Sequence, residues 1–170
     1  KPKRTIVFIG FAGEEFGLLG AQAWVKAHKD KLPKIANLFN RDGGPEPPVG
    51  ISVPQAMYDD FVKISEPIQK IRPDYPFEVK VREPRKRPTR MGGTDASVFA
   101  IEGVPTLGFT TEDFKGYDFD YGEIWHTERD LYTKNIPEYQ EHTATVTAII
   151  ALGVANLDKQ LSREGLYTEE

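Results

Sequence analysis

The apolar residues fall into short runs whose spacing changes along the chain. Residues 5–11 are almost continuously apolar, which predicts a strand buried on both faces of a parallel sheet. From Phe16 the apolar positions recur at helical spacing, which predicts a helix that ends near His28. Two adjacent acids, Glu14 and Glu15, stand where the pattern changes. Open α/β sheets bind ligands at the carboxyl ends of their strands, so this junction is a candidate site.

Side chains of adjacent residues at a helix start point about 100° apart, so Glu14 and Glu15 do not easily share one role. One carboxylate could hold a cation while the other acts as a general base. The alternative is that both are solvated acids favoured by the positive end of a helix. Gly17 and Gly20 would let the helix backbone approach the sheet closely.

A second apolar run, residues 35–39, predicts another strand, and Asp42 with Gly43 and Gly44 follows it directly. Asp42 is therefore another acid at a strand end, unless it only begins an ordinary Asp-Gly turn. A proline-rich stretch, residues 45–48, then predicts a stiff connector.

Further patterns predict the remaining helices and strands. They are a helix over residues 55–71, a strand over 77–82, a helix over 92–99 that Thr94 or Asp95 caps, a strand over 103–109 and a helix over 138–161. The tail after Ser162 is polar and is expected to fray. The basic stretch 83–90 is either a solvated loop or a group of arginines that binds a carboxylate.

The long segment over residues 112–125 has no clear period and mixes aromatic residues with carboxylates. A loop of this length is often functional, and this one could form an apolar side-chain pocket with anionic groups for a cation. His126 ends the loop in an aromatic setting, and Asp130 follows. His142 lies beside Glu141 on the last predicted helix and is expected to be exposed.

Composition and charge narrow the classes of function. With 170 residues, 39% of them hydrophobic, the chain is expected to form a single domain. Its net charge of -4 argues against a general binder of nucleic acid or anionic membranes. No apolar run approaches the roughly 20 residues of a membrane span. Because the chain has no cysteine, any metal must be held by His, Asp or Glu.

Glu15, Asp42 and His126 together form a plausible cysteine-free zinc set. Several motifs resemble, in the same order, those of the co-catalytic zinc aminopeptidase family, which includes plasma glutamate carboxypeptidase and, more distantly, the glutaminyl cyclases. These motifs are Phe11-Ala-Gly-Glu-Glu-Phe-Gly-Leu-Leu-Gly-Ala21, Asn40-Arg-Asp-Gly-Gly44, Thr94-Asp95 with Gly103-Val-Pro105, and Trp125-His-Thr-Glu-Arg-Asp130. The resemblance implies a three-layer α/β/α sandwich around a mixed, mainly parallel sheet, and a zinc-dependent exopeptidase that acts on a peptide or dipeptide.

The resemblance also implies roles for single residues. Glu14 matches the general base, which takes a proton from water and later gives it to the leaving amine. Glu15 and His126 match the ligands of one zinc ion, and Asp42 matches a ligand of a second zinc ion. Two zinc ions would together polarise the scissile carbonyl.

The resemblance is incomplete in two respects. Asp95 and Asp130 match acids that orient the ligands, but a histidine and a bridging aspartate that complete the five protein ligands are expected upstream of Thr5. The chain begins at Lys1, so we interpret residues 1–170 as the carboxyl-terminal part of a catalytic domain. Carrying three of five ligands, it is expected to bind zinc weakly and not to hydrolyse peptides alone. No tyrosine directly precedes Thr94, so the loop that contains Tyr117 and Tyr121 is expected to stabilise the developing negative charge.

Alternatives remain open at this point. Carboxylates of residues 112–123 could receive a substrate ammonium, as in an aminopeptidase. Arg85, Arg87 or Arg90 could instead receive a free carboxylate, as in a carboxypeptidase or dipeptidase of the same family. A non-catalytic protein-binding domain on this scaffold is the third interpretation. A sheet without its first strands would expose an edge and could self-associate, and the family resemblance favours a secreted or periplasmic location.

Overall fold

A small mixed sheet lies at the centre of the structure, a computed structural model that describes residues 1–168. Its strands are β1 (Pro48–Val53), β2 (Glu78–Val81) and β3 (Phe109–Thr111), in the order β2-β1-β3. β1 runs parallel to β2 and antiparallel to β3. Ile51 in the central strand is opposite Val79 on one side and Phe109 on the other.

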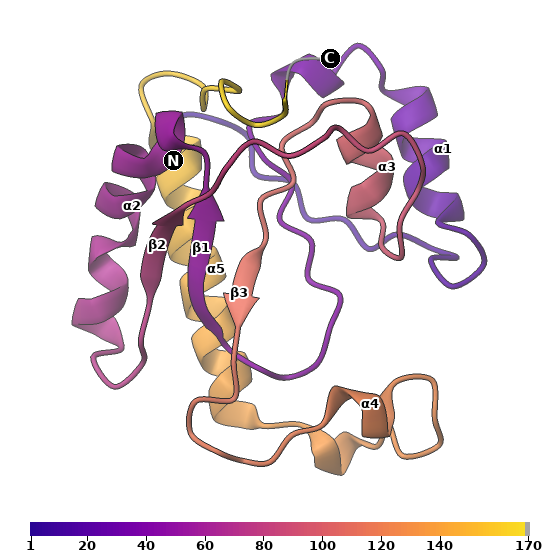
Figure 1. Cartoon of the computed structure of the whole chain (residues 1–170), viewed down its shortest axis with the longest axis vertical. Helices are drawn as coiled ribbons and strands as arrows, with labels where there is room; N and C mark the ends of the chain where they lie inside the picture. The colour runs from indigo at the N-terminus through magenta and orange to yellow at the C-terminus, as the bar shows by residue number, and fades with distance from the viewer. Residues whose placement is uncertain (169–170) are drawn as a thin grey trace.

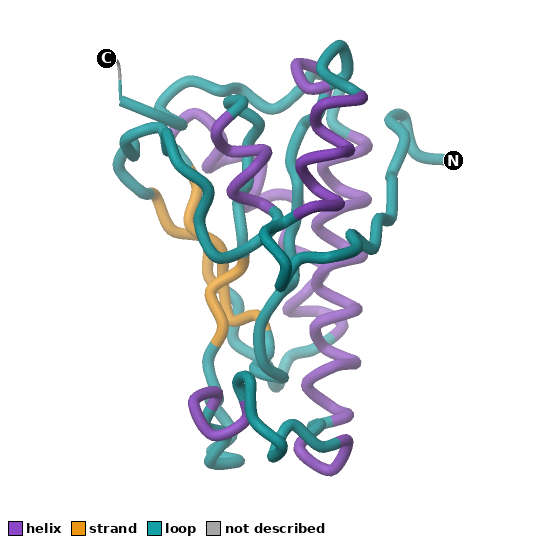
Figure 2. The backbone as a smooth tube through the Cα atoms, turned by 90° about the vertical axis from the view of Figure 1, so that its right-hand side faces the viewer, coloured by secondary structure: helices purple, strands orange, loops and turns teal. Residues whose placement is uncertain are grey.

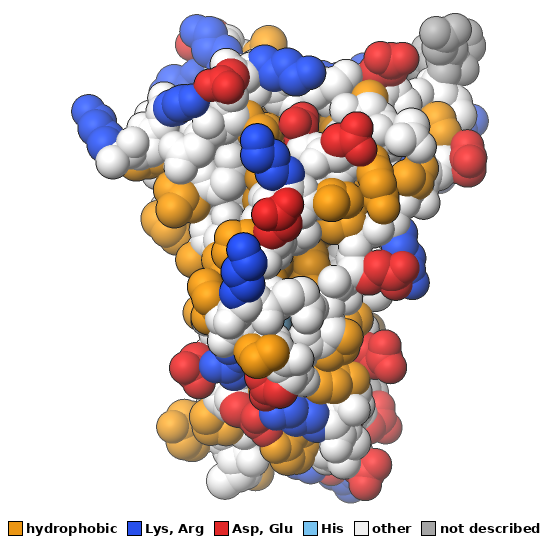
Figure 3. Space-filling model, turned by 90° about the vertical axis from the view of Figure 1, so that its left-hand side faces the viewer, with side chains coloured by type: hydrophobic (Ala, Val, Ile, Leu, Met, Phe, Trp, Pro, Cys, Tyr) orange, Lys and Arg blue, Asp and Glu red, His pale blue; other side chains and the backbone are white. Residues whose placement is uncertain are grey.

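Two long helices, α2 (Tyr58–Ile71) and α5 (Pro137–Asn156), pack against each other and on one face of this sheet (Figures 1 and 2). A 3-10 turn, Gln55–Met57, leads into α2. The core between helices and sheet consists of buried apolar side chains, including Ile51, Val53, Met57, Phe61, Ile68, Val146 and Ile150. Gly153 allows the close approach of the two helices, because a Cβ atom at this position would overlap the side chain of Ile64. Acidic, basic and apolar side chains are interspersed over the outer face shown in Figure 3.

Two shorter helices, α1 (Leu19–Ala27) and α3 (Ala96–Ile101), lie side by side and enclose a second core (Figure 1). Its buried members are Leu18, Ala21, Val25, Leu32, Val98, Phe99 and Val104. The short helix α4 (Tyr121–Ile124) lies at the same end of the molecule as the start of α5. Two 3-10 turns, Leu32–Lys34 and Tyr132–Lys134, complete the helical elements of the described chain.

The expected α/β class, with a mixed sheet flanked by helices, is confirmed. The helix predicted over residues 55–71 is also confirmed, since Met57, Phe61, Ile64 and Ile68 are all buried. No helix within residues 1–168 is both long and apolar enough to cross a membrane.

The strand predicted over residues 5–11 is wrong. The segment has no strand partner among the described residues, and Arg4, whose N–H binds the Ala155 carbonyl at 3.0 Å, ties its start to the end of α5. Val7 and Phe8 are 65% and 93% exposed, whereas Ile6 and Phe11 are half-buried and Phe11 packs against the second core. A β-ladder needs a neighbouring backbone, which this part of the chain does not find.

The other strands differ from their predicted bounds. Residues 35–39 are extended, but they make single contacts, such as the Leu38 N–H to the Pro105 carbonyl at 2.9 Å, and no ladder. The strand predicted over 103–109 begins only at Phe109. The central strand β1 was not predicted from the sequence, where residues 45–48 were interpreted as a stiff connector, and Pro48 is the first residue of the strand. Proline is tolerated at the first position of a strand, so it marks the start of β1 rather than its absence.

The last helix and the tail also differ from the prediction. α5 ends at Asn156 instead of residue 161, because Leu157 turns into extended backbone. The tail does not fray within the described residues, since Leu161 and Leu166 are buried in the main core and Tyr167 bridges to Arg85.

His142 was expected to be exposed and is fully buried. Its Nε2 lies 3.0 Å from the Pro48 carbonyl oxygen, and its ring stacks on Tyr75 with centroids 3.9 Å apart. The polar neighbour Glu141 misled the prediction. Tyr139 and Val146, three and four residues away on the same helix face, are both buried and place His142 inside.

Candidate active site

A pocket of about 790 Å³ lies between the Glu14-Glu15 turn, the turn after Phe39 and the loop that ends at His126. Five of the six predicted site residues line it, namely Glu14, Glu15, Asp42, His126 and Asp130. Asp95 lies outside the lining but in the same region, because its charge acts on Glu14 and it is in turn affected by Asp42.

The Glu14-Glu15 turn is built by left-handed backbone. Gly13 and Gly17 have φ values of 69° and 99°, which glycine adopts without steric cost. The Glu14 carbonyl accepts hydrogen bonds from the N–H groups of Gly17 at 3.0 Å and Leu18 at 2.8 Å, and α1 follows. Gly20 lies so close to residue 12 that a Cβ atom would be 2.7 Å from its backbone, whereas a Cβ atom at Gly17 would meet nothing within 4 Å. The close approach at Gly20 is thus to the turn before α1 and not, as was expected, to the sheet.

His126 comes from the opposite end of the chain and meets Glu15. The His126 Nε2 lies 2.8 Å from Glu15 Oε1, although 111 residues separate the two. His126 has a left-handed φ of 57°, which is uncommon for a residue with a Cβ atom. Its ring stacks on Trp125 at 4.5 Å, and Trp125 stacks in turn on Tyr121 at 6.5 Å. Both side chains of the Glu15–His126 pair are more than half exposed, so solvent reaches them from the pocket.

The acids of the site repel one another. The pKa of Glu14 is raised, first by partial burial and then by the charges of Asp42, Glu15 and Asp95, while His126 acts in the opposite direction. Burial, with a contribution from Asp42, also raises the pKa of Asp95. Clustered carboxylates with raised pKa values are typical of sites that bind a cation or transfer a proton.

Asp95 is the first residue before α3, but it does not cap the helix through its side chain. The backbone carbonyl of Thr94 accepts from the Ser97 hydroxyl at 2.8 Å. The Asp95 Oδ1 is buried without a hydrogen-bond partner among the described residues. A buried carboxylate oxygen without a partner is costly, and a donor or cation outside this set of atoms would relieve it.

The types of side chain at the site suit zinc, but within the described chain too few of them lie close together to hold an ion. Carboxylate and imidazole are ordinary zinc ligands. Within residues 1–168, however, no three His, Asp or Glu side chains lie close enough together to hold an ion. The structure brings one ligand pair into contact, Glu15 with His126, and places Asp42 on the same pocket.

Arg41 is a pocket residue that the sequence analysis did not single out. Its guanidinium donates to the carbonyls of Gly44 and Glu46, the latter at 2.8 Å, so the arginine folds back over its own turn. Arg41 stands directly before Asp42 in the motif Asn40-Arg-Asp-Gly-Gly44, and this position next to a predicted site residue could have identified it. The arginines expected to receive a carboxylate, Arg85, Arg87 and Arg90, are not among the residues that line the pocket. The Arg87 side chain donates to the Ile101 carbonyl at 2.9 Å, and the backbone of Arg85 bridges to that of Tyr167.

The loop over residues 112–125 divides into a part that lines the pocket and a part that anchors it. Tyr121 lines the pocket, whereas the Tyr117 hydroxyl contacts Glu138 on α5. Asp113 accepts from backbone N–H groups of the loop, and Glu123 pairs with Lys134 at 2.9 Å. These two carboxylates therefore hold the loop and do not point to a substrate ammonium.

An α/β domain with carboxylates and an imidazole gathered at one pocket has the architecture of a metal-dependent hydrolase. The family model for peptidase family M28 matches residues 1–150, and the chain belongs to that family. Carboxypeptidase Q of Mus musculus is 24% identical over 168 residues, which cover 96% of this chain and 32% of that protein. A probable zinc metalloprotease of Pyrenophora tritici-repentis is 52% identical over 42 residues, or 25% of this chain and 10% of that protein.

Solved structures agree with this assignment. A peptidase M28 precursor from Shewanella amazonensis superposes with a TM-score of 0.71 at 26% identity, covering 95% of this chain and 34% of that one. A zinc aminopeptidase from Bacillus subtilis superposes with a TM-score of 0.55 at 17% identity, covering 93% of this chain and 37% of that one, which supports the fold alone. The chain thus spans 32% of the length of the carboxypeptidase Q that it matches.

Proposed function

We propose that this chain carries part of the active site of a zinc-dependent exopeptidase that hydrolyses peptides. Glu15 and His126 would hold one zinc ion, Asp42 would contribute to a second, and Glu14 would act as the general base. The observation that carries the proposal is the 2.8 Å contact between Glu15 and His126. Exposed side chains 111 residues apart in sequence have little structural reason to meet at a pocket lined by further acids.

The residues of the chain would divide the chemistry among them. Zinc, when bound, polarises the peptide carbonyl and makes water more acidic. The Glu14 carboxylate would accept a proton from water on one oxygen and release it to the departing amine. Its raised pKa supports this role, because a base works best when its pKa lies close to the working pH. Tyr121, which lines the pocket, is the better placed of the two loop tyrosines to face developing negative charge.

A carboxypeptidase or dipeptidase is the second candidate within the same class. Arg41 lines the pocket and carries the positive charge that a free substrate carboxylate would need. Asp130 lines the pocket as well and would suit a substrate ammonium instead. The two residues thus distinguish the two kinds of exopeptidase.

The chain by itself supplies fewer zinc donors than a complete two-metal site. We therefore expect the 170-residue chain to bind zinc in the micromolar range or more weakly, about -8 kcal/mol or less favourable, and not to hydrolyse peptides. Calorimetric titration with zinc chloride tests the assignment. Glu15→Gln and His126→Gln should each abolish the zinc heat, whereas the matched control His28→Gln, at the end of α1, should retain it.

Two results would contradict the proposal. If His28→Gln weakens zinc binding as much as His126→Gln does, the metal is not held at the pocket. If the chain alone binds two zinc ions tightly or turns over peptides, the expected shortage of donors is wrong.

A further inference from the structure

The loop that delivers His126 to the pocket is anchored at the first turn of α5, by residues that do not line the pocket themselves. Asp113 holds the loop in its fold, because its carboxylate accepts hydrogen bonds from the N–H groups of Tyr117 at 3.1 Å and Phe119 at 3.4 Å. The hydroxyl of Tyr139 on α5 donates to the same carboxylate at 2.6 Å and accepts from the N–H of Lys115 at 3.0 Å. The loop is thus folded on itself and fastened to the helix by one tyrosine.

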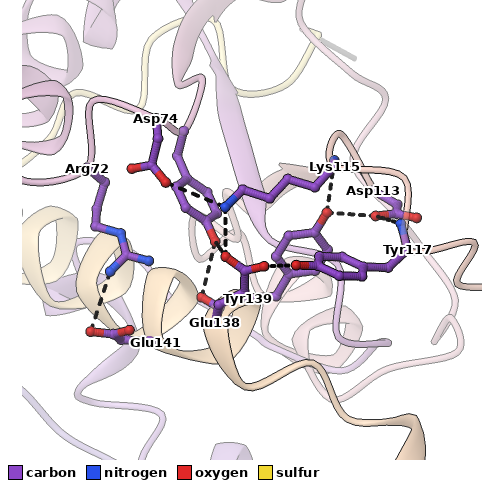
Figure 4. A network of polar contacts seen from close by, with 9 residues as sticks. Arg72, Asp74, Asp113, Lys115, Tyr117, Glu138, Tyr139 and Glu141 are labelled. Carbon is purple, nitrogen blue, oxygen red and sulfur yellow. Dashed lines mark hydrogen bonds and ion pairs between the residues drawn. The ribbon is translucent and has the colours of Figure 1, made fainter.

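Glu138, the residue before this tyrosine, makes the second fastening (Figure 4). One carboxylate oxygen accepts from Lys115 Nζ at 2.7 Å and from the Tyr75 hydroxyl at 3.0 Å, and the other contacts the Tyr117 hydroxyl. Lys115 Nζ also lies 3.5 Å from Asp74 and 4.5 Å from the centre of the Tyr75 ring. Glu138 therefore connects the loop to α5 and to the turn that follows α2.

This arrangement differs from an ordinary surface ion pair. The side chains of Glu138 and Lys115 are only 35% and 28% exposed, and each has further polar or aromatic partners. A pair held by several groups in a partly desolvated place restricts geometry more than a solvated pair does. The ion pair between Arg72 and Glu141, 3.4 Å apart, differs on its acidic side: Arg72 is 18% exposed and lies over the Tyr75 ring, but Glu141 is 70% exposed.

The part of the loop between this anchor and His126 is locally stiff. Asp120 caps α4 by accepting from the Gly122 N–H at 2.8 Å, and the Thr127 hydroxyl donates to the Glu123 carbonyl at 2.8 Å. The Phe119 ring rests on Gly44, where a Cβ atom would be 2.5 Å from it, so the loop also touches the turn that carries Asp42. A displacement at the anchor would therefore be passed along to His126.

We propose that Glu138 is a positioning residue for the zinc site: through Lys115 and Tyr117 it holds the loop in the place where His126 faces Glu15. Glu138 does not line the pocket and would touch neither metal nor substrate. The inference rests on the proposed function for its zinc readout, but the position of the loop can be measured without zinc.

The zinc-free measurement uses Trp125, which stacks on His126 and is one of two tryptophans in the chain. Trp24→Phe leaves Trp125 as the only tryptophan, and acrylamide quenching of its fluorescence then reports its accessibility in the folded chain. In this background Glu138→Gln should raise the quenching constant, because the loop loses its charged anchor. Glu141→Gln, the same substitution one turn along the same helix, should leave the constant unchanged.

The zinc measurement follows on the same variants. Glu138→Gln should weaken zinc binding about tenfold, as loss of groups that orient metal ligands does elsewhere, and Glu141→Gln should not. If Glu138→Gln does not fold, Tyr117→Phe removes a single hydroxyl from the anchor and should raise the quenching constant in the same direction.

The outcomes separate the two proposals. A merely structural Glu138 would lower the urea concentration of unfolding and leave native-state quenching of Trp125 unchanged, and that result would overturn the inference. If the parent chain binds no zinc but the quenching constants separate as expected, the zinc site fails for this chain and the positioning role of Glu138 stands.

Discussion

The buried imidazole of His142 makes the free energy of unfolding depend on pH below the ordinary histidine pKa of about 6.5. Burial is the main reason why the pKa of His142 is lowered, and the cations Arg72 and Lys115 act in the same direction. The hydrogen bond to the Pro48 carbonyl and the charge of Asp74 favour the proton but do not outweigh burial. His142 is therefore neutral in the folded chain near neutral pH.

The sign of the effect follows from proton linkage. Below the ordinary histidine pKa of about 6.5, the unfolded chain binds a proton at His142 more readily than the folded chain does. Its contribution to stability is thus fully present above that pH and is lost as pH falls. The loss approaches about 1.4 kcal/mol per pH unit until the folded-state pKa is reached.

The perturbation that isolates this group is His142→Phe, which keeps a ring against Tyr75 but cannot titrate. At pH 8 the variant should be less stable by about 1–3 kcal/mol, because the Pro48 carbonyl loses its donor. Between pH 6.5 and 5 the difference in unfolding free energy between parent and variant should shrink. Protonation of His142 in the unfolded state lowers the stability of the parent, but the variant has no imidazole to protonate. Urea unfolding followed by far-ultraviolet circular dichroism gives both curves.

Tyr139→Phe is the matched control on the same helix. It removes a buried hydroxyl that contacts Asp113 but keeps His142. The pKa of Tyr139 itself is raised to about 12, outside the window, so the difference from the parent should stay constant between pH 5 and 8. Parallel curves for the parent and His142→Phe over this range would refute the reasoning, because they would mean that His142 does not resist protonation.

Two further predictions concern the substrate and the exposed amino-terminal segment. Arg41→Gln should weaken binding of a free-acid dipeptide by about 1.5–3 kcal/mol, the value of a hydrogen bond to a charged group. Calorimetry should show no change in binding of the corresponding dipeptide amide. Equal losses for the two ligands would remove the carboxypeptidase candidate. Phe8, 93% exposed, should help two copies associate. Phe8→Asp should weaken this expected self-association by about 1.5–3 kcal/mol in sedimentation experiments, the value of burying one large apolar side chain. Ile71→Asp, at another exposed apolar position, is the control, and equal effects would argue against pairing through the segment.

Elements that bury one face were predictable from the sequence, and elements defined by distant partners were not. α2 was correct because its apolar spacing alone places Phe61 and Ile68 in the core. The strand at residues 5–11 failed because an apolar run indicates burial but does not supply a pairing partner. β1 was not predicted, because the prolines at its start indicated only a connector. His142 was predicted to be exposed because of its neighbour Glu141, although its position on the helix face places it in the core.

The site shows the same division. The resemblance brought Glu14, Glu15, Asp42 and His126 to one place, and the structure places all four around one pocket. It could not reveal how His126 arrives there. The anchor at Glu138 depends on contacts between residues 21 positions apart or more, such as Tyr117 with Glu138, and no local pattern marks them.

The separation of Glu15 from His126 has a consequence for biosynthesis. His126 is synthesised 111 residues after Glu15, and the helix turn that anchors the histidine loop comes later still. Closing so long a loop is entropically unfavourable until the two cores have formed. The nascent chain therefore cannot form the predicted Glu15–His126 pair until His126 and the first turn of α5 have been made.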